Sequence, residues 1–274
     1  MGNQIASKWV DSMYQIPKTI HYCWFGGNPL GEKERTCIES WKKFLPDYEI
    51  KRWDESNWDV RCCDYVSEAY DARQWAFVSD YARFDILYRY GGLYFDTDVE
   101  LIKSINDVLT RGSFMGFETD WDGDSGGTVN PGLGLGAIPG LSLYQTLLVT
   151  YQGNHFVNPD GSFDQTTVVT RTTKVLLGRG LERKSGIQQV DGVWIYPSEY
   201  FNPKDFQTGE IHLARNTRSI HHFNMSWYSP EQKFEHDVNE WLRHKGVDNK
   251  IAHRLAAGLA IVRYLDVSRI ANHR

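Results

Sequence analysis

The sequence predicts an α/β layered domain with largely parallel strands. Candidate strands and helices alternate through the first half of the chain, which is typical of this class. Glycine and proline residues separate the candidate elements. With 274 residues, 41% of them hydrophobic and 24% charged, the chain has the composition of a soluble globular protein and forms one large domain or two small ones. Sheets of this class bind ligands beyond the carboxyl ends of their strands.

Periodicity and turn residues define the elements of the first half. Apolar residues alternate after Pro17 and stop at Gly26-Gly27, which predicts a strand. The strongest helix is closed by Gly91-Gly92 at its C-terminus, and the strand after it loses its apolar character at Asp96. The predicted elements are strand 16–27, helix 32–44, strand 48–53, helix 67–90 and strand 93–101.

The second half begins with a glycine-rich stretch over 111–140, which predicts loops around one strand. Further elements follow from periodicity. They are helices over 141–151 and 166–177, strands over 193–196 and 219–223, and helices over 231–244 and 250–270. We expect two parts, a catalytic domain over residues 1–230 and a helical extension over 231–274.

Charge and cysteine usage limit the partners. A net charge of −5 argues against a nucleic-acid partner, although residues 241–274 carry +5 and the rest of the chain −10. The four cysteines form no disulfide or zinc-finger pattern, residues 1–20 lack an apolar signal core, and no apolar run reaches the length of a membrane span. We therefore expect a cytoplasmic protein.

The residue pair Asp96 and Asp98 is the first candidate site. On an extended chain both carboxylates project to one side, while Thr97 points to the other. Two such acids repel each other unless a hard cation such as Mg²⁺ or Mn²⁺ lies between them and bridges them to phosphate oxygens. The D-x-D pattern alone is more often the solvated end of a strand, so the neighbouring residues must decide whether Asp96 and Asp98 form a metal site.

The preceding helix supplies that context. Ala76, Asp80 and Arg83 share one helix face at i, i+4 and i+7, and Ser79 lies beside them. Taken alone, Asp80 and Arg83 describe an ion pair on a solvated helix. Because the helix runs directly into Gly91-Gly92 and the acidic strand, the sequence predicts one continuous site.

The run from Ala76 to Asp98, AxxSDxxRxxxLYxxGGxYxDxD, resembles the sugar-binding D-x-D region of glycosyltransferase family 32. That family includes yeast mannosyltransferases and bacterial capsule and cell-surface polysaccharide enzymes, and the clostridial glucosylating toxins carry a similar block. IPKTIHYCWFGG at 16–27 and HHFNMSW at 221–227 also resemble family blocks. The resemblance implies a GT-A type, Rossmann-like fold and a retaining, metal-dependent reaction in cell-surface polysaccharide synthesis. The donor would be a nucleotide diphosphate sugar, UDP-sugar before GDP-mannose, and the acceptor a glycan or lipid-linked saccharide.

The resemblance also implies residue roles. Trp24 would stack on the base, Arg83 would stabilise the leaving diphosphate, and Asp98 would ligate the metal directly, with Asp96 in its outer shell and on the ribose side. Asp96, Asp98 and Arg83 are the expected catalytic residues. The expected nucleotide-sugar residues are Trp24, Asn57, Ser79, Asp80, Arg83, Tyr94, Asp96, Ser226 and Trp227. The expected ligands of Mn²⁺ or Mg²⁺ are Asp96, Asp98 and His221, with His222 or Asn224 as alternates.

No residue declares itself as a nucleophile for a double displacement. Candidates are Glu118, Asp120, Asp122, Asp124 and the pair Asp164-Gln165. We expect instead a same-face reaction in which the leaving phosphate helps to deprotonate the acceptor hydroxyl.

The C-terminal helix has two interpretations. Ile251, Leu255, Leu259 and Val262 form an apolar stripe, with Arg254 and other basic residues around it. The stripe either docks on the catalytic domain or attaches the protein to an anionic bilayer, at the inner face of the plasma membrane.

Two rival functions have some support. FDTDVE resembles the nucleophile motif of haloacid-dehalogenase-type phosphatases, but in those enzymes the motif opens the domain. A non-catalytic carbohydrate-binding protein would explain the 14% aromatic content, yet it does not need Asp80, Arg83 and a metal pair together.

Overall fold

We describe a computed structural model of the chain that covers residues 15–123, 126–206, 208–224 and 230–264. Contacts divide the chain into two compact units. The first unit runs to Pro203 and includes His212–His222, and the second contains Lys204–Ile211 and the chain from Phe223 onward. The expected division at residue 230, with the extension packed on the domain or on a membrane, stays a prediction.

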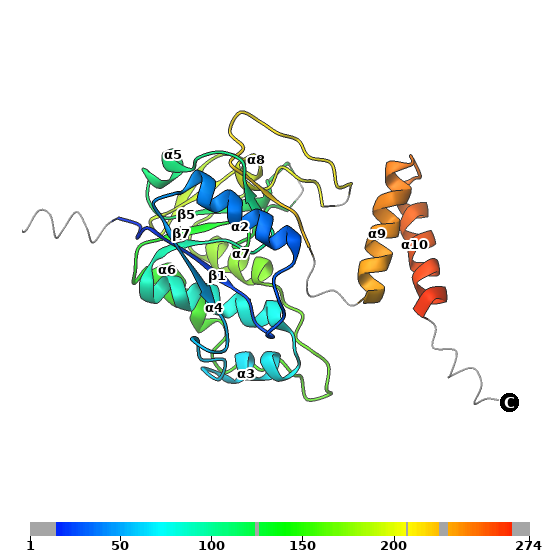
Figure 1. Cartoon of the computed structure of the whole chain (residues 1–274), viewed down its shortest axis with the longest axis horizontal. Helices are drawn as coiled ribbons and strands as arrows, with labels where there is room; N and C mark the ends of the chain where they lie inside the picture. The colour runs from blue at the N-terminus through cyan, green and yellow to red at the C-terminus, as the bar shows by residue number, and fades with distance from the viewer. Residues whose placement is uncertain (1–14, 124–125, 207, 225–229, 265–274) are drawn as a thin grey trace, which may run out of the picture. The chain divides into compact units, whose positions relative to one another are not determined.

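One mixed sheet forms the centre of the first unit (Figure 1). Its strands are β1 (Thr19–Cys23), β2 (Glu49–Trp53), β3 (Gly92–Tyr94), β5 (Phe114–Thr119), β6 (Thr128–Val129), β7 (Leu135–Ala137), β8 (Gln188–Val190) and β9 (Val193–Tyr196). They follow the order β2-β1-β3-β7-β5-β9-β8, and β6 pairs with β5. β1 is parallel to β2 and β3, β5 is parallel to β9, and β7 is antiparallel to both β3 and β5. Five strands, β2, β1, β3, β5 and β9, therefore run in one direction, which confirms the α/β class.

Alternation along the strands separates two apolar clusters. Ile20 and Leu93 belong to one cluster, whereas Cys23 and Tyr94 belong to the other. The helices divide in the same way, because α2 packs in the first cluster and α3, α4, α6 and α7 pack in the second. The helices of the first unit are α2 (Glu32–Phe44), α3 (Asp64–Asp71), α4 (Trp75–Tyr90), α5 (Asn106–Leu109), α6 (Ser142–Val149), α7 (Val168–Gly178) and α8 (Ser198–Phe201). The sheet is thus covered by helices on both faces.

Two elements that the sequence predicted as continuous are each divided into two in the structure. The helix expected over 67–90 is two helices, α3 and α4, because Arg73 adopts a left-handed conformation with φ 58° between them. The strand expected over 93–101 is also two strands. β3 lies in the main sheet, whereas β4 (Val99–Leu101) pairs antiparallel with β10 (Ser219–His221) in a separate two-stranded sheet. A turn closed by the Val99 amide and the Asp96 carbonyl, 3.0 Å apart, joins them.

The glycine pair after α4 has the predicted role. Gly91 caps the helix with φ 62°, and its amide donates to the Leu87 carbonyl at 2.8 Å. Gly92 enters β3 with φ 98°, and a Cβ there would come within 3.0 Å of the Thr19 carbonyl of β1. Glycine at both positions therefore lets α4 turn sharply into the sheet next to β1. The glycine-rich stretch over 111–140 was expected to hold one strand, and its described residues form three: β5, β6 and β7.

The second unit contains α9 (Pro230–His244) and α10 (Asn249–Tyr264). The two helices lie side by side (Figure 1). Ala252, Ala256 and Ala260 recur every four residues on α10 and are fully buried, since small side chains let the helices approach closely. Within the described ranges, no helix combines the length and the apolar character that crossing a bilayer requires.

Candidate functional site

The candidate site lies at one edge of the sheet. β2, β1 and β3 are adjacent and parallel, so their carboxyl ends meet there. Trp24 directly follows β1, the segment from Asp54 to Asn57 follows β2, and Asp96 follows β3. The topology therefore gathers on one edge three segments that the sequence predicted to bind nucleotide.

A turn and a neighbouring sheet bring the metal candidates together. Asp96 and Asp98 lie on either side of Thr97 in the turn between β3 and β4. His221 pairs with Val99 across the two-stranded sheet, which places its imidazole beside the turn. One donor atom from each of Asp96, Asp98 and His221 lies within 4.8 Å of the other two. The turn, rather than the strand alternation expected from sequence, brings the carboxylates together.

The two adjacent histidines point in different directions, as expected on a strand. His221 is buried, and its Nε2 lies 3.1 Å from Asp98 Oδ1. His222 is half-buried and its Nε2 lies 2.9 Å from Glu100 Oε2. Among the described residues the three-residue group includes neither His222 nor Asn224, the alternates expected from sequence. His221 is therefore the histidine placed to serve as ligand.

The electrostatics of this group favour a bound cation. Burial raises the pKa of Asp96, the Arg83 guanidinium opposes that rise, and the negative charge of Asp98 adds to it. Burial lowers the pKa of His221, but Asp98 and Asp96 outweigh burial and raise it above its ordinary value. Two carboxylates and an imidazole supply the oxygen and nitrogen donors that Mn²⁺ accepts. The residues present therefore fit a divalent metal.

Arg83 joins the helix face to the acidic turn. It is almost fully buried, its Nη2 lies 2.8 Å from Asp80 Oδ1, and the same nitrogen lies 3.4 Å from Asp96 Oδ1. Tyr94 donates its hydroxyl to Asp96 Oδ1 at 3.0 Å, and its ring lies 5.2 Å from the guanidinium carbon. Asp80 and Arg83 are thus a buried pair, not a pair on a solvated face, and Arg83 positions both carboxylates.

Asp80 links this cluster to α7. Burial raises its pKa to about 6, against the lowering effect of Arg83 and with a further increase from Asp96. The backbone N–H of Val168, at the start of α7, hydrogen-bonds to the Asp80 carboxylate, and this contact favours the charged form. Ser79, one residue earlier, donates its hydroxyl to the Trp75 carbonyl at 3.0 Å within the helix. Its predicted contact with the donor stays a prediction.

A loop that sequence reasoning did not assign to the site holds Asp96 from the other side. The Asp96 amide donates to the Gly132 carbonyl at 3.3 Å. The Gly132 amide donates to Asn130 Oδ1 at 2.7 Å, and Asn130 Nδ2 donates to Glu118 Oε1 at 3.0 Å. The sequence signal for this loop was the glycine-rich run NPGLGLG. Glycine is required at position 132 because its backbone passes directly against the Asp96 carboxylate.

The expected nucleotide contacts at Trp24 and Asn57 lie in structured loops. Trp24 is half-buried, and its Nε1 donates to the Asn28 carbonyl at 2.6 Å. Asn57 is exposed, accepts the Asp54 amide at 2.9 Å and donates to the Arg52 carbonyl at 3.0 Å. The Asn57 amide group thus shapes its own loop. Two further expected residues, Ser226 and Trp227, lie outside the described residues.

The nucleophile candidates differ in their surroundings. Glu118 lies close enough to His221 for its charge to raise the imidazole pKa. Asp120 accepts hydrogen bonds from the amide and hydroxyl of Ser198 at the start of α8. Asp164 forms an ion pair with Arg171. Asp120 and Asp164 therefore have structural partners, and Asp124 lies outside the described residues.

Comparison with known families identifies this region. Residues 31–115 match the family described as "Glycosyltransferase sugar-binding region containing DXD motif". The match includes α4, the glycine pair and the Asp96–Asp98 turn, and it confirms the resemblance predicted from the run 76–98.

Two relatives from Schizosaccharomyces pombe are glycosyltransferases. Inositol phosphoceramide mannosyltransferase 1 is 27% identical over 130 residues, which are 40% of this chain and 38% of the relative. Inositol phosphoceramide mannosyltransferase 3 is 35% identical over 102 residues, 34% of this chain and 27% of the relative. The chain thus spans well under half the length of each relative.

Three solved structures are similar at low identity. The PaToxG glycosyltransferase has a TM-score of 0.43 at 18% identity. The match covers 64% of this chain and 76% of the PaToxG chain. Galactosyltransferase LgtC, in complex with donor and acceptor sugar analogs, has a TM-score of 0.43 at 13% identity, covering 88% and 95%. A glycosyltransferase involved in glycosylation of the major capsid of PBCV-1 has a TM-score of 0.41 at 11% identity, covering 77% and 95%.

Proposed function

We propose that the protein is a metal-dependent glycosyltransferase of GT-A type that transfers a hexose from a nucleotide diphosphate sugar with retention of configuration. The observation that carries the proposal is the convergence of Asp96, Asp98 and His221 on one point, at the edge of the sheet that also carries Trp24. The family match over residues 31–115 supports the class of reaction.

In this proposal the buried side chains fix the position of the acidic turn. Arg83 and Tyr94 bind the same oxygen of Asp96, which leaves Asp96 Oδ2 available for a ligand. His221 would complete the ligand set with Asp98. Asp80, buried beside Arg83, would accept a hydrogen bond from a hydroxyl of the donor sugar. A bound Mn²⁺ or Mg²⁺ would supply positive charge that stabilises the departing diphosphate.

The transfer step we propose needs no enzyme nucleophile. The acceptor oxygen bonds to the anomeric carbon on the face from which the diphosphate leaves, the bond from that carbon to the phosphate oxygen breaks, and the acceptor proton passes to the leaving phosphate. Asp120 and Asp164 have structural partners, which agrees with this view. If intact-protein mass spectrometry detected a covalent glycosyl-enzyme after incubation with donor alone, the same-face mechanism would be refuted in favour of a double displacement.

The names of the relatives suggest the substrates. Both are mannosyltransferases with a phosphoceramide acceptor in their names, which favours a mannosyl donor and an acceptor on a lipid. We therefore propose a lipid-linked acceptor in cell-surface polysaccharide synthesis, reached from the cytoplasm. A panel of nucleotide sugars with Mn²⁺ tests the donor, with GDP-mannose and UDP-hexoses compared by hydrolysis and by thermal shift.

The decisive experiment replaces Asp98 by asparagine, which keeps its size and removes its charge. Turnover of the best donor in the panel should fall by about 100-fold or more, because several kcal/mol of charge stabilisation depend on the metal. Asp47→Asn makes the same chemical change at an exposed side chain and should leave turnover unchanged. Metal-dependent turnover that survives Asp98→Asn would refute the proposed centre.

A further inference from the structure

The exposed surface of α10 carries an apolar stripe, formed by Ile251, Leu255, Leu259 and Val262. These side chains are between 48% and 71% exposed. The stripe is not the face that holds the two helices together, because the buried face of α10 is formed by Ala252, Ala256 and Ala260. At 100° per residue the stripe covers about 80° of the helix surface. Within the pair formed by α9 and α10, α10 therefore buries its smallest apolar side chains and leaves these larger ones outside the pair.

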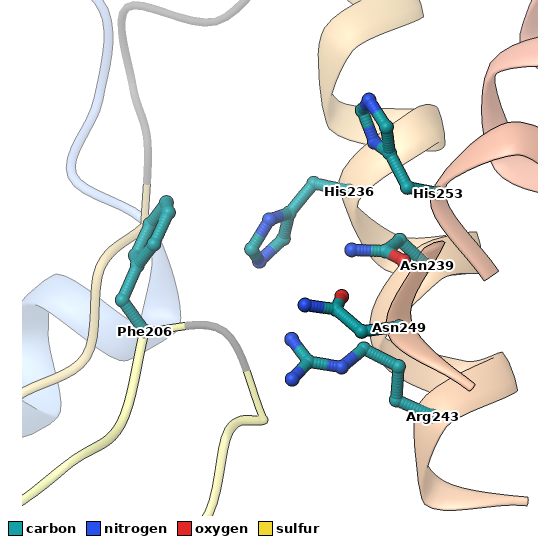
Figure 2. A pocket seen from close by; sticks show the side chains of 6 residues that line it. All are labelled: Phe206, His236, Asn239, Arg243, Asn249 and His253. Carbon is teal, nitrogen blue, oxygen red and sulfur yellow. The ribbon is translucent and has the colours of Figure 1, made fainter. Parts of the chain in front are cut away.

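The polar side of α10 faces elsewhere. Figure 2 shows a pocket of the second unit in which Asn249 and His253 of α10 gather with side chains of α9 and with Phe206. Asn249 and His253 lie roughly 120–160° around the helix from the centre of the stripe. The stripe is thus separate from this polar pocket and forms a surface of its own.

The charge of α10 is entirely positive. Between Asn249 and Tyr264 the helix has Lys250, Arg254 and Arg263 and no aspartate or glutamate. Arg254 borders the stripe on one side, about 60° from Ile251. The Arg263 guanidinium lies on the other side, 4.3 Å from the Phe234 ring of α9. A helix with an apolar stripe bordered by cations is the pattern that binds an anionic bilayer surface.

We propose that α10 lies in the interface of an anionic lipid bilayer, with the apolar stripe inserted below the headgroups and Arg254 beside lipid phosphates. From Ile251 to Val262 the stripe is about 16 Å long, so the helix lies parallel to the surface. A second copy of the chain is a poorer occupant, because two α10 helices face to face bring cations together without a compensating carboxylate. The inference stands on α10 alone and does not require the proposed activity.

The test uses the full chain and vesicles of phosphatidylcholine, with or without 30 mol% phosphatidylglycerol. Co-sedimentation should occur with the anionic vesicles, weaken from low to high salt, and be at least ten-fold weaker with neutral vesicles. The triple variant Ile251→Gln, Leu255→Gln and Leu259→Gln should lose at least ten-fold in partitioning, while keeping its helical circular dichroism because glutamine is a good helix former. Val149→Gln makes the same kind of change at an exposed position of α6 and should bind as the parent does.

Each other result contradicts the proposal. Undiminished vesicle binding by the triple variant would show that the stripe is not inserted, and equal binding to both vesicle types would remove the role of Arg254. A dimer in sedimentation velocity that the triple variant dissociates, without vesicle binding, would make a second copy the occupant. Donor hydrolysis without vesicles should be the same in the parent and the triple variant, so failure here is distinguishable from failure of the proposed activity.

Discussion

Gly132→Ala should disable the acidic turn without removing any functional group. A Cβ at Gly132 would lie closer than 3.0 Å to Asp96 Oδ2, a separation that real Cβ atoms essentially never show, and 3.2 Å from Asp96 Cγ. Gly132 has no positive φ, so alanine meets no backbone strain there. The collision with Asp96 is therefore the dominant effect of this substitution.

The size of the displacement follows from the contacts. Ordinary van der Waals contact begins at 3.4 Å, so the carboxylate oxygen must withdraw by at least 0.4 Å and Cγ must follow. Asp96 is held by Tyr94 at 3.0 Å and by Arg83 at 3.4 Å, so any withdrawal strains both contacts. Because misplaced active-site groups cost up to about 100-fold in rate, we expect a loss of about 10- to 100-fold in turnover and in metal affinity. Crowding should also cost about 1–3 kcal/mol of unfolding free energy.

The assay measures Mn²⁺ binding by calorimetry, hydrolysis of the nucleotide sugar and urea unfolding on the same samples. Gly178→Ala is the matched control, since nothing lies within 4 Å of a Cβ there and its φ is not positive. The control should retain metal affinity and turnover. If the Mn²⁺ affinity and turnover of Gly132→Ala stay within two-fold of the parent, the position of Asp96 against the Gly132 backbone is not needed for metal binding or catalysis.

Three further results are expected. Burial lowers the pKa of His21 to about 4 from 6.5, so the unfolded chain binds more protons between these values and His21 should lower the unfolding free energy by about 2 kcal/mol from pH 7 to pH 5. The raised pKa of Asp80 acts in the opposite direction over this range, so the measurement is the difference between the parent and His21→Gln in urea titrations, in which the parent should lose about 2 kcal/mol more than the variant. Trp41→Ala should cost about 3–5 kcal/mol by the same method, because Trp41 is fully buried and donates to the Val99 carbonyl at 2.7 Å. Iodoacetamide at pH 7.5 should label Cys63 before Cys23, as read by peptide mass spectrometry, since a hydrogen bond from its neighbouring cysteine lowers the pKa of Cys63 to about 7 and burial raises that of Cys23 to about 12. Equal labelling, an unchanged pH profile or a stable Trp41 variant would each contradict its prediction.

Local patterns predicted most of the elements because their signals act within a few residues. The helix over 32–44 and the strand over 193–196 have the predicted bounds. Glycine at 91 and 92 also had the predicted role, since positive φ and close approach to β1 exclude other residues. The break at Arg73 could not be predicted, because a non-glycine residue with positive φ has no sequence signal and is held there by its surroundings.

The sequence by itself determined the chemistry of the candidate site. Its motif joined Asp80 and Arg83 to Asp96 and Asp98, and one spacing placed the first two on a single helix face. Only the tertiary structure decided how these groups meet. The turn after β3, the pairing of β10 with β4 and the loop at Gly132 bring His221 and the carboxylates together from segments far apart in the chain. Spacing along a chain fixes which neighbours share a face, whereas the distance between remote side chains depends on how sheets and loops pack, and that packing has no local code.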